Sequence, residues 1–357
     1  MQEPFVSRAL LKSFVPLENL IDPQLDQLLS QSEVVHYYKG QNLLRAGESA
    51  QRHIYLLHGS LTLVSELGEI TELHAGDAQS RQPVAHAFPR RVTVAAGSDC
   101  SVLKVNTDLL ENLLCWGQVS RCLLAEIAMD DEYADDFFWI SKLMQSRLFY
   151  KVSPANIRKI LRRFLEVSVF AENHVINEGD EGSCCYLIKS GVAQVFVKSE
   201  GADPVAELGP GAVFGEDALV ANKPRNASVI MKTDGLLLKL EKNDFYQLLS
   251  APPVTMVTPG NLEGFLQSGA RLLDVRTEKE FELGHHGQAT HLPINLVYLK
   301  SRLLDPKILY ITISPTEERA RTAAYLLSQQ GFQAYALQSG MNSLPRELAD
   351  KFTASRK

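Results

Sequence analysis

Residues 214–229 read Phe214-Gly-Glu-Asp-Ala-Leu-Val-Ala-Asn-Lys-Pro-Arg-Asn-Ala-Ser-Val229 and lie between short apolar runs. Gly215 lets the backbone approach a ligand, and the turn after it can begin a short helix whose N–H groups face an anion. The Arg225 guanidinium can donate paired hydrogen bonds to a small anion. Glu216 suits a hydroxyl group, because a carboxylate only accepts hydrogen bonds. These residue types suit the binding of a small anion and of a hydroxyl group.

This stretch belongs to the second copy of an internal repeat. The two copies read Tyr38-Lys-Gly-Gln-Asn-Leu-Leu-Arg-Ala-Gly-Glu48 with Ile54-Tyr-Leu-Leu-His-Gly-Ser-Leu-Thr-Leu63, and His174-Val-Ile-Asn-Glu-Gly-Asp180 with Cys185-Tyr-Leu-Ile-Lys-Ser-Gly-Val-Ala-Gln-Val195. Gly47 and Gly179 stand where a turn needs positive φ. Gly59 and Gly191 each separate two apolar runs, which predicts a hairpin. The repeat indicates two β-rich domains of the same kind.

Amphipathic helices are expected on both sides of each copy, because apolar residues recur there at helical spacing. The expected ranges are 16–29 and 153–165 before the copies, and 107–134 and 242–250 after them. Pro252 and Pro253 end the last of these helices abruptly.

The pattern changes after Thr258. Helices are expected over 262–267 and 317–329, and strands over 271–274, 307–313 and 334–337. Strands that alternate with helices predict a small parallel α/β domain.

The second copy, over roughly 149–250, resembles the cyclic nucleotide-binding family, which includes kinase regulatory subunits and catabolite activator proteins. The resemblance is carried by Phe-Gly-Glu, then Ala-Leu, then Pro-Arg-x-Ala-Ser. It implies that Glu216 holds the ribose 2′-hydroxyl and that Arg225 holds the cyclic phosphate. It also implies a cradle of backbone groups from Gly215, Ala218, Asn226 and Ala227. The alternative is a surface Glu–Arg pair that caps a loop.

The base that the ligand carries is open to two interpretations. Asn226 stands where family members that prefer cyclic GMP often have Thr or Ser, so cyclic AMP is expected and cyclic GMP is the alternative. In the family, a C-terminal helix usually covers the base. Here Pro252 and Pro253 shorten that helix, so the lid must come from elsewhere or be absent.

The first copy has diverged in the corresponding stretch. A gap-free alignment from Gly76 and Gly211 pairs Ser80 with Gly215, Arg81 with Glu216, Pro83 with Ala218, Arg90 with Arg225 and Arg91 with Asn226. In this alignment an arginine, which has no acceptor for a ribose hydroxyl, replaces the glutamate. The favoured interpretation is a degenerate domain kept for packing and dimer contacts. The alternative is a site for a more anionic ligand, such as a cyclic dinucleotide, held by Arg81, Arg90 and Arg91.

The C-terminal part, over roughly 258–350, resembles the rhodanese family through Leu272-Leu-Asp-Val-Arg-Thr-Glu-Lys-Glu-Phe281, Gly284-His285 and Leu292-Pro293. Catalysis in that family needs a thiolate in a loop before a helix. The loop here reads Ser314-Pro-Thr-Glu-Glu-Arg319, and no cysteine follows Cys185. The resemblance therefore implies a degenerate loop with Ser314 at the cysteine position and Arg319 at its end, and no sulfur transfer by the usual route.

Other positions of this part support the same interpretation. Glu317 and Glu318 bring negative charge into a loop that normally receives anions, which argues against phosphatase chemistry. Gln288 and Ser339 stand where the family usually has glycine. Asp274 and Arg276 are expected to be structural residues.

Composition sets the broad class of the protein. The 357 residues carry a net charge of −6, with 45% hydrophobic and 22% charged residues, which is typical of a globular protein and argues against nucleic acid as a partner. No signal peptide or membrane span is apparent, and the five cysteines match no zinc module, so no metal is expected. A cytoplasmic protein with reduced thiols is expected.

The predicted fold class is multidomain α+β, with two β-roll domains (double-stranded β-helix, jelly-roll-like) over 1–135 and 136–253, and a small α/β rhodanese-like domain over 254–357. The expected function is that of a bacterial cyclic-nucleotide receptor in signal transduction, without cofactor or catalysis. An unknown protein partner and a possible homodimer are expected. The alternatives are a cyclic-di-GMP receptor, a residual hydrolytic or sulfurtransferase-like enzyme, with Ser314 as nucleophile in the hydrolytic case, and an inert scaffold.

Overall fold

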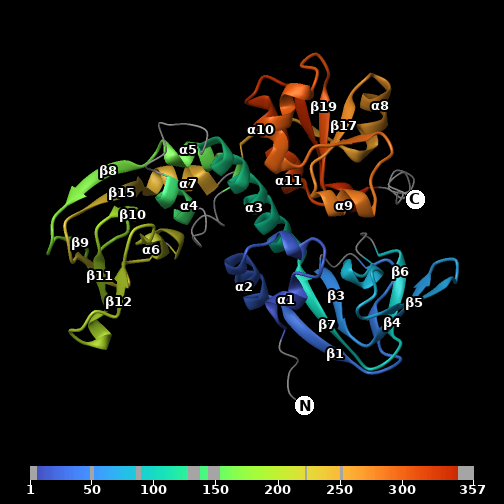
Figure 1. The fold of residues 1–357 in the computed structure, drawn as a ribbon, viewed down its shortest axis with the longest axis horizontal. Coiled ribbons are helices and arrows are strands. Elements are labelled where there is room, and N and C mark those ends of the chain that lie inside the picture. The colour runs from blue at the N-terminus through green and yellow to red at the C-terminus, as the bar shows by residue number, and fades with distance from the viewer. Residues whose placement is uncertain are drawn as a thin grey trace. The chain divides into compact units, whose positions relative to one another are not determined.

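The computed structural model describes residues 6–48, 52–85, 90–127, 137–143, 153–221, 223–249 and 252–344 (Figure 1). The chain divides into two compact units. One comprises Met1–Gln118 with Pro253–Lys357, and the other Val119–Pro252. The first unit joins the N-terminal β-roll to the C-terminal α/β domain, and the second unit contains the other β-roll.

The first β-roll consists of two antiparallel sheets. One sheet has the order β1 (Glu33–Tyr37), β7 (Cys100–Asn106), β3 (Arg52–His58), and the other β2 (Asn42–Leu44), β6 (Val92–Ala96), β4 (Ser60–Ser65), β5 (Ile70–His74). Leu61, Val94 and Val102 pack fully buried in its core. Burying apolar side chains such as these stabilises the domain, at about 25 cal/mol per Å² of apolar surface.

The second β-roll repeats this plan with two four-stranded sheets. They have the orders β13 (Val213–Phe214), β10 (Cys184–Ser190), β15 (Gly235–Glu241), β8 (Leu165–Val169) and β12 (Ala206–Leu208), β11 (Ala193–Phe196), β14 (Ser228–Met231), β9 (His174–Ile176). Alternate residues of β14, Val229 and Met231, point into the core, as the two-residue period of a strand requires. The two β-rolls predicted from the repeat are thus present.

The hairpins predicted at Gly59 and Gly191 are wrong. β3 and β4, on either side of Gly59, lie in different sheets, and so do β10 and β11 on either side of Gly191. Both glycines have positive φ, and an added Cβ would lie 2.4 Å from the Asp99 carbonyl oxygen or 2.7 Å from that of Asp234. Each glycine therefore marks a corner at which the chain crosses from one sheet to the other.

The helices are α1 (Arg8–Leu11), α2 (Asp22–Ser30), α3 (Thr107–Ile127), α4 (Phe137–Leu143), α5 (Ile157–Leu161), α6 (Glu216–Ala221) and α7 (Lys242–Leu249). The helix expected over 16–29 is interrupted, because Leu17–Asn19 forms a 3-10 turn and Pro23 opens α2. The helix expected over 153–165 ends at Leu161, and Leu165 already belongs to β8. Of the helix expected over 107–134, residues 128–134 lie outside the described residues.

The C-terminal domain has one fully parallel sheet with helices beside it (Figure 1). The strand order is β16 (Met256–Val257), β20 (Ala334–Leu337), β19 (Tyr310–Ile313), β17 (Arg271–Asp274), β18 (Ala289–His291), and the helices are α8 (Leu262–Gln267), α9 (Glu278–Leu283), α10 (Val297–Lys300) and α11 (Glu317–Ser328). The predicted parallel α/β domain is confirmed. Its strand expected over 307–313 begins only at Tyr310, because Lys307 is held in a turn by Asp305. β16 and β18 escaped prediction because they are so short.

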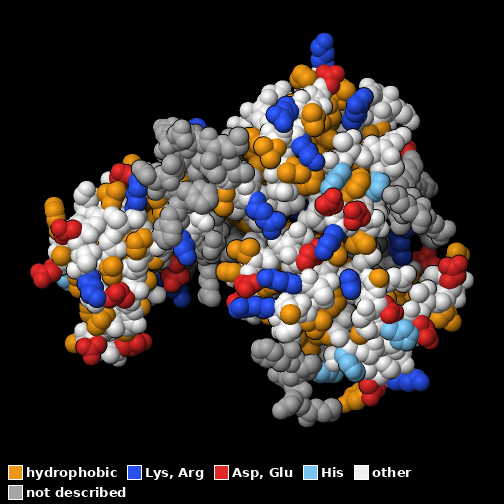
Figure 2. All heavy atoms as spheres, in the orientation of Figure 1, with side chains coloured by type: hydrophobic (Ala, Val, Ile, Leu, Met, Phe, Trp, Pro, Cys, Tyr) orange, Lys and Arg blue, Asp and Glu red, His pale blue; other side chains and the backbone are white. Residues whose placement is uncertain are grey.

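The surface carries charges of both signs. Figure 2 shows acidic and basic side chains interspersed over the visible face. Among the described helices, none is both long enough and apolar enough to cross a membrane.

Candidate functional site

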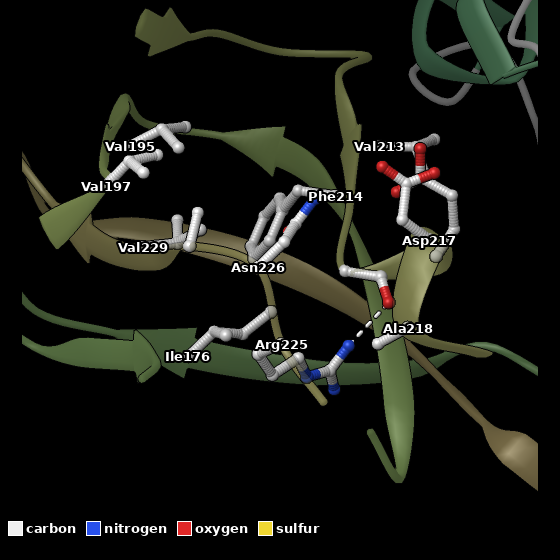
Figure 3. Close-up of a pocket in the computed structure, with 13 residues that line it drawn as sticks. Ile176, Val195, Val197, Val213, Phe214, Asp217, Ala218, Arg225, Asn226 and Val229 are labelled. Carbon is white, nitrogen blue, oxygen red and sulfur yellow. Dashed lines mark hydrogen bonds between the residues drawn. The ribbon is translucent and has the colours of Figure 1, made fainter. Parts of the chain in front are cut away.

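A cavity of about 280 Å³ opens in the second β-roll (Figure 3). Small-molecule sites usually occupy about 300–1,000 Å³, so this cavity suits a small ligand. Its lining residues are Ile176, Val195, Val197, Val213, Phe214, Gly215, Glu216, Asp217, Ala218, Arg225, Asn226, Ala227 and Val229. The four residues expected to form the cradle, together with Glu216 and Arg225, therefore all line one cavity.

Arg225 is fixed from several sides. Its Nη1 donates to the Gly215 carbonyl at 2.5 Å, and its Nη2 donates to the Cys184 carbonyl at 2.6 Å. Its own backbone is held by Gly179 and Asp180, at 2.9 and 2.8 Å. The side chain is only 6% exposed. These contacts use two of the five N–H donors of a guanidinium, so the group is held in place and can still engage an anion.

Gly215 is required by its surroundings. It adopts φ +82°, and a Cβ there would lie 2.7 Å from Ile176 Cδ1 and 2.8 Å from Arg225 Nη1. Any side chain at this position would displace the guanidinium or the wall of the cavity. The turn therefore depends on glycine for its conformation and for the close approach to Arg225.

Glu216 begins α6 directly after this turn and is half-buried. Burial raises the pKa of the neighbouring Cys185 thiol to about 12, and the charge of Glu216 adds to this rise. That thiol is therefore inert at neutral pH. α6 is tied to α7 because the Tyr246 hydroxyl donates to the Leu219 carbonyl at 2.8 Å. The cavity wall and the last helix of the β-roll are thus mechanically linked.

The cavity has one polar and one apolar side. Figure 3 shows Val195, Val197 and Val229 on the side away from Asp217. The Phe214 ring stacks on that of Tyr186, with centroids 5.4 Å apart. A ligand with an anionic end and a flat apolar part matches this division.

The lining residues all lie between 176 and 229. α7 ends at Leu249, and residues 250–251 lie outside the described residues. The source of a lid over the cavity therefore stays a prediction.

The first β-roll holds Arg90 as the second holds Arg225. Arg90 Nη2 donates to the Arg52 carbonyl at the start of β3, as Arg225 does to Cys184 at the start of β10. Its backbone pairs with Gly47 and Glu48 at 2.8 and 2.9 Å. Arg90 is 1% exposed, and burial lowers the pKa of its guanidinium to about 10. The pairing of Arg90 with Arg225 is therefore supported by geometry.

The alignment of Ser80 with Gly215 and of Arg81 with Glu216 is wrong. The residue that accepts from Arg90 Nη1 and has positive φ, at +49°, is Ala85. Ala85 thus corresponds to Gly215. Only four residues separate Ala85 from Arg90, whereas nine separate Gly215 from Arg225. The stretch between the two positions is therefore five residues shorter in the first β-roll, which a gap-free alignment hides.

The three arginines considered for a second anion site have different settings. Arg81 is exposed on the 3-10 turn Gln79–Arg81, Arg90 is buried, and Arg91 is half-buried. With the corrected alignment, Arg81 no longer stands for the ribose-binding glutamate. This second site stays a prediction.

The loop of the C-terminal domain places Ser314 between β19 and α11, fully buried. Its hydroxyl donates to the Thr316 carbonyl at 2.5 Å and accepts from the Ala320 N–H at 3.0 Å. Both contacts hold the loop together, so the hydroxyl has a structural role here. Ser339 has φ +60°, which explains why glycine is usual at its position.

Asp274 and Arg276 form a buried pair. The guanidinium Nη2 donates to Asp274 Oδ2 at 2.7 Å and to the Gly284 carbonyl at 2.6 Å. The pair closes the segment between β17 and α9, as expected of structural residues. Within the part of the chain that the structure describes, no cluster of His, Cys, Asp and Glu is placed to hold a metal ion.

Comparison with known protein families agrees with this architecture. Residues 34–114 and 166–251 match the cyclic nucleotide-binding domain, and residues 258–345 match the rhodanese-like domain. The chain carries two cyclic nucleotide-binding domains and a rhodanese-like domain. The fold class predicted from the repeat and from the C-terminal pattern is confirmed.

The curated relatives are regulatory proteins and a channel. A cAMP-dependent protein kinase regulatory subunit of Eremothecium gossypii is 28% identical over 59% of this chain and 43% of its own length. A cGMP-dependent protein kinase of Eimeria tenella is 22% identical over 90% of this chain and 29% of its own length. A cyclic nucleotide-gated potassium channel of Mesorhizobium japonicum is 37% identical over 30% of this chain and 28% of its own length.

The chain spans less than half of the length of these relatives. Fungal kinase regulatory subunits are prominent among them, so the expected bacterial origin is not supported. Among known structures, the regulatory domain of Toxoplasma gondii PKA with cAMP is 18% identical over 73% of this chain and 93% of that chain, with a TM-score of 0.28. The Thermus thermophilus catabolite activator protein is 29% identical over 34% of this chain and 57% of that chain, with a TM-score of 0.26.

Proposed function

We propose that this chain is a cyclic-nucleotide-responsive regulatory protein whose second cyclic nucleotide-binding domain holds the ligand. In this proposal Arg225 binds the cyclic phosphate, and Glu216 accepts a hydrogen bond from the ribose 2′-hydroxyl. The observation that carries the proposal is the convergence of Gly215, Glu216 and the fixed Arg225 guanidinium on one cavity. A guanidinium that donates to an anion and an acceptor-only carboxylate, both lining the same cavity, fit a cyclic phosphate fused to a ribose.

Cyclic AMP is the proposed ligand, and cyclic GMP is the alternative. The relatives include several cAMP-dependent kinase regulatory subunits beside a cGMP-dependent kinase, which supports this order. Asn226 lines the cavity and offers both a donor and an acceptor to the base or the phosphate.

The rhodanese-like domain is proposed to act without catalysis, as an output or interaction domain. Ser314 cannot carry a persulfide, and its hydroxyl is committed to two backbone contacts. We propose that ligand binding acts through α6, Tyr246 and α7 on the segments that follow, because this contact links the cavity wall to the last helix. The protein partner that would receive the signal is proposed only as a class, a protein bound through this domain.

Calorimetric titration of the full chain with cyclic AMP and cyclic GMP tests this function. We expect heat with at least one nucleotide in the wild type, and loss of binding by about tenfold or more in Arg225→Lys, because lysine cannot reproduce paired hydrogen bonds. Arg163→Lys is the matched control, since Arg163 pairs with Asp244 on an exposed part of the same unit. The absence of heat with both nucleotides would refute the proposal.

A further inference from the structure

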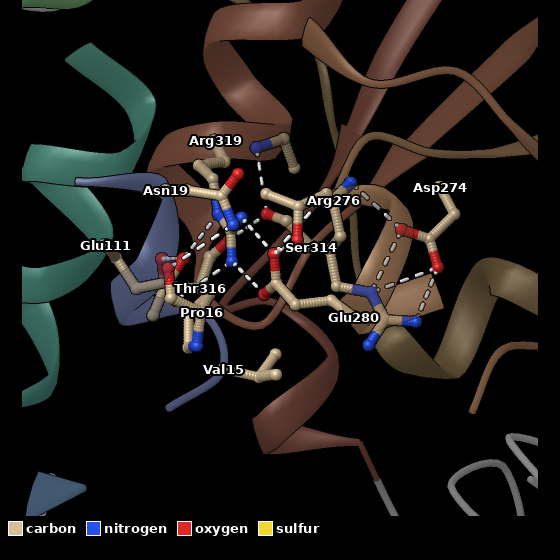
Figure 4. Close-up of polar contacts among 12 residues, drawn as sticks. Val15, Pro16, Asn19, Glu111, Asp274, Arg276, Glu280, Ser314, Thr316 and Arg319 are labelled. Atoms are coloured by element: carbon tan, nitrogen blue, oxygen red, sulfur yellow. Dashed lines mark hydrogen bonds and ion pairs between the residues drawn. The ribbon is translucent and has the colours of Figure 1, made fainter. Parts of the chain in front are cut away.

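A buried ion cluster joins the first cyclic nucleotide-binding domain to the rhodanese-like domain (Figure 4). Arg319, at the start of α11, donates from Nε to Glu111 Oε2 at 2.6 Å and from Nη2 to Glu111 Oε1 at 2.9 Å. It also donates to both carboxylate oxygens of Glu280, at 2.9 and 2.7 Å. The side chains of Arg319, Glu111 and Glu280 are 0%, 2% and 8% exposed.

The three residues come from three different elements. Glu111 lies on α3, the helix that follows the first β-roll, whereas Glu280 lies on α9 of the rhodanese-like domain. Glu280 is already held by the backbone N–H and hydroxyl of Thr277, at 3.0 and 2.7 Å. Glu111 therefore enters a receptor that the rhodanese-like domain builds from its own residues.

The loop itself also contacts this carboxylate. The Thr316 hydroxyl donates to Glu111 Oε2 at 3.4 Å, and Figure 4 shows Glu111 reaching from α3 towards Thr316 and Arg319. The carboxylate thus has two kinds of donor, a loop hydroxyl and a bidentate guanidinium. This is the donor set by which proteins hold an oxyanion.

We propose that loop 314–319 is an intramolecular docking site whose occupant is the Glu111 carboxylate of α3. The clasp formed by Glu111, Arg319 and Glu280 holds the rhodanese-like domain on the first domain, and its opening frees the loop together with the covered face of α3. In the closed state the Glu111 carboxylate occupies the loop, so an external oxyanion cannot bind there.

The electrostatics support a specific contact. Burial raises the pKa of Glu111, although the charge of Arg319 opposes this rise. Burial also opposes ionisation of Glu280, but Arg319, with smaller contributions from Arg276 and Thr277, outweighs it, so the pKa of Glu280 is lowered to about 2. Two carboxylates sharing one guanidinium leave excess negative charge in a buried place. Removing the guanidinium fork would take away the positive charge that the two carboxylates share, which opens the contact.

Cys115 offers a direct readout of this opening. It follows Glu111 by one helical turn and therefore lies on the same face of α3. Its thiol is fully buried beside Glu318 and Thr322 of α11. The opposite side of α3 is held independently, because Gln24 of α2 donates to the Leu113 carbonyl at 3.1 Å. Undocking of the rhodanese-like domain thus exposes Cys115 while α3 stays folded.

The test is alkylation of the native full chain with iodoacetamide, with the modified cysteines assigned by peptide mass spectrometry. Glu111→Ala and Arg319→Lys are compared with Asp108→Ala, an exposed carboxylate on the same helix. We expect Cys115 to react about tenfold faster in both clasp variants, and at the wild-type rate in the control. Cys100 and Cys184, in the two β-roll cores, should keep their wild-type rates in every variant.

Two results would overturn the proposal. One is a Cys115 rate within about twofold of wild type in both clasp variants. The other is a parallel rise at Cys100 and Cys184, which would assign the cluster to global stability instead. Should neither variant fold, alkylation of the wild type at rising urea concentration decides. The clasp requires Cys115 to become reactive at a lower urea concentration than Cys100 and Cys184, and simultaneous reaction of all three would overturn it. The proposal does not depend on nucleotide binding, so the two can fail separately.

Discussion

Replacing Glu216 by alanine removes the only carboxylate that we assign to the ribose. A hydrogen bond to a charged group contributes about 1.5–3 kcal/mol. Glu216 is half-buried, which places its contribution towards the lower end of this range. At about 1.4 kcal/mol per tenfold change in Kd, we expect Glu216→Ala to bind cyclic AMP roughly 10–30-fold more weakly than the wild type.

The sharper form of this experiment changes the ligand as well. The wild type should bind 2′-deoxy cyclic AMP more weakly than cyclic AMP by the same factor, because the analogue lacks the hydroxyl that donates to Glu216. Glu216→Ala should bind cyclic AMP and its 2′-deoxy analogue equally. If the binding free energies lost by removing the carboxylate and by removing the hydroxyl do not add, the difference measures the contact between these two groups.

Calorimetric titration gives all four dissociation constants. Asp217→Ala is the matched control, because Asp217 is the next residue of α6, lines the same cavity and is exposed. It should keep the preference for cyclic AMP over the 2′-deoxy analogue. Equal binding of the two ligands by the wild type would refute the assignment of Glu216 to the 2′-hydroxyl, even if the protein binds cyclic AMP.

Three further predictions concern stability and binding. Gly215→Ala should weaken nucleotide binding and destabilise the second β-roll by about 1–3 kcal/mol in urea unfolding. Gly201→Ala is the control, because Gly201 also has positive φ but an added Cβ there has no atom within 4 Å, so this variant should leave binding unchanged. Equal effects of the two variants on binding would contradict the steric argument. Burial raises the pKa of Glu18, so its charged form destabilises the fold and Glu18→Gln should have a higher melting temperature than the wild type at pH 7. The difference in melting temperature should shrink as the pH falls to the raised pKa and below it. A difference that widens in acid would refute the direction of this effect. Ser314→Ala should lower the free energy of unfolding in urea by about 1–3 kcal/mol, because the Thr316 carbonyl and the Ala320 N–H lose their hydrogen bonds to the hydroxyl. Ser328→Ala, at an exposed serine, should lower it little, and equal losses would argue against the structural role of Ser314.

The repeat and the strand–helix alternation were enough to predict the architecture. Gly47 and Gly179 occur at equivalent turns, and both have positive φ as expected. Two local predictions failed because a sequence pattern reports strand ends but not strand partners. Gly59 and Gly191 do separate strands, yet the strands pair in opposite sheets, and pairing depends on contacts far along the chain.

The stretch 214–229 likewise shows what sequence can and cannot predict. Its residue types and spacing were sufficient to single out Gly215, Glu216 and Arg225, because the chemistry of a small anion needs those groups close together. The counterpart in the first domain could not be aligned by spacing alone. Only the shared contacts of Arg90 and Arg225 with equivalent strand ends revealed that Ala85 replaces Gly215 and that the loop is shorter.

The sequence by itself determined the domain types, the stretch 214–229 with Gly215, Glu216 and Arg225, and the serine in the rhodanese-like loop, because each is encoded by neighbouring residues. Only the tertiary structure decided what Arg319 does. Its partner Glu111 lies 208 positions away on a helix of another domain, and no local pattern signals such a pairing. The physical reason is burial. A guanidinium removed from water needs carboxylate partners, and only the tertiary packing of the two domains places Glu111 beside it.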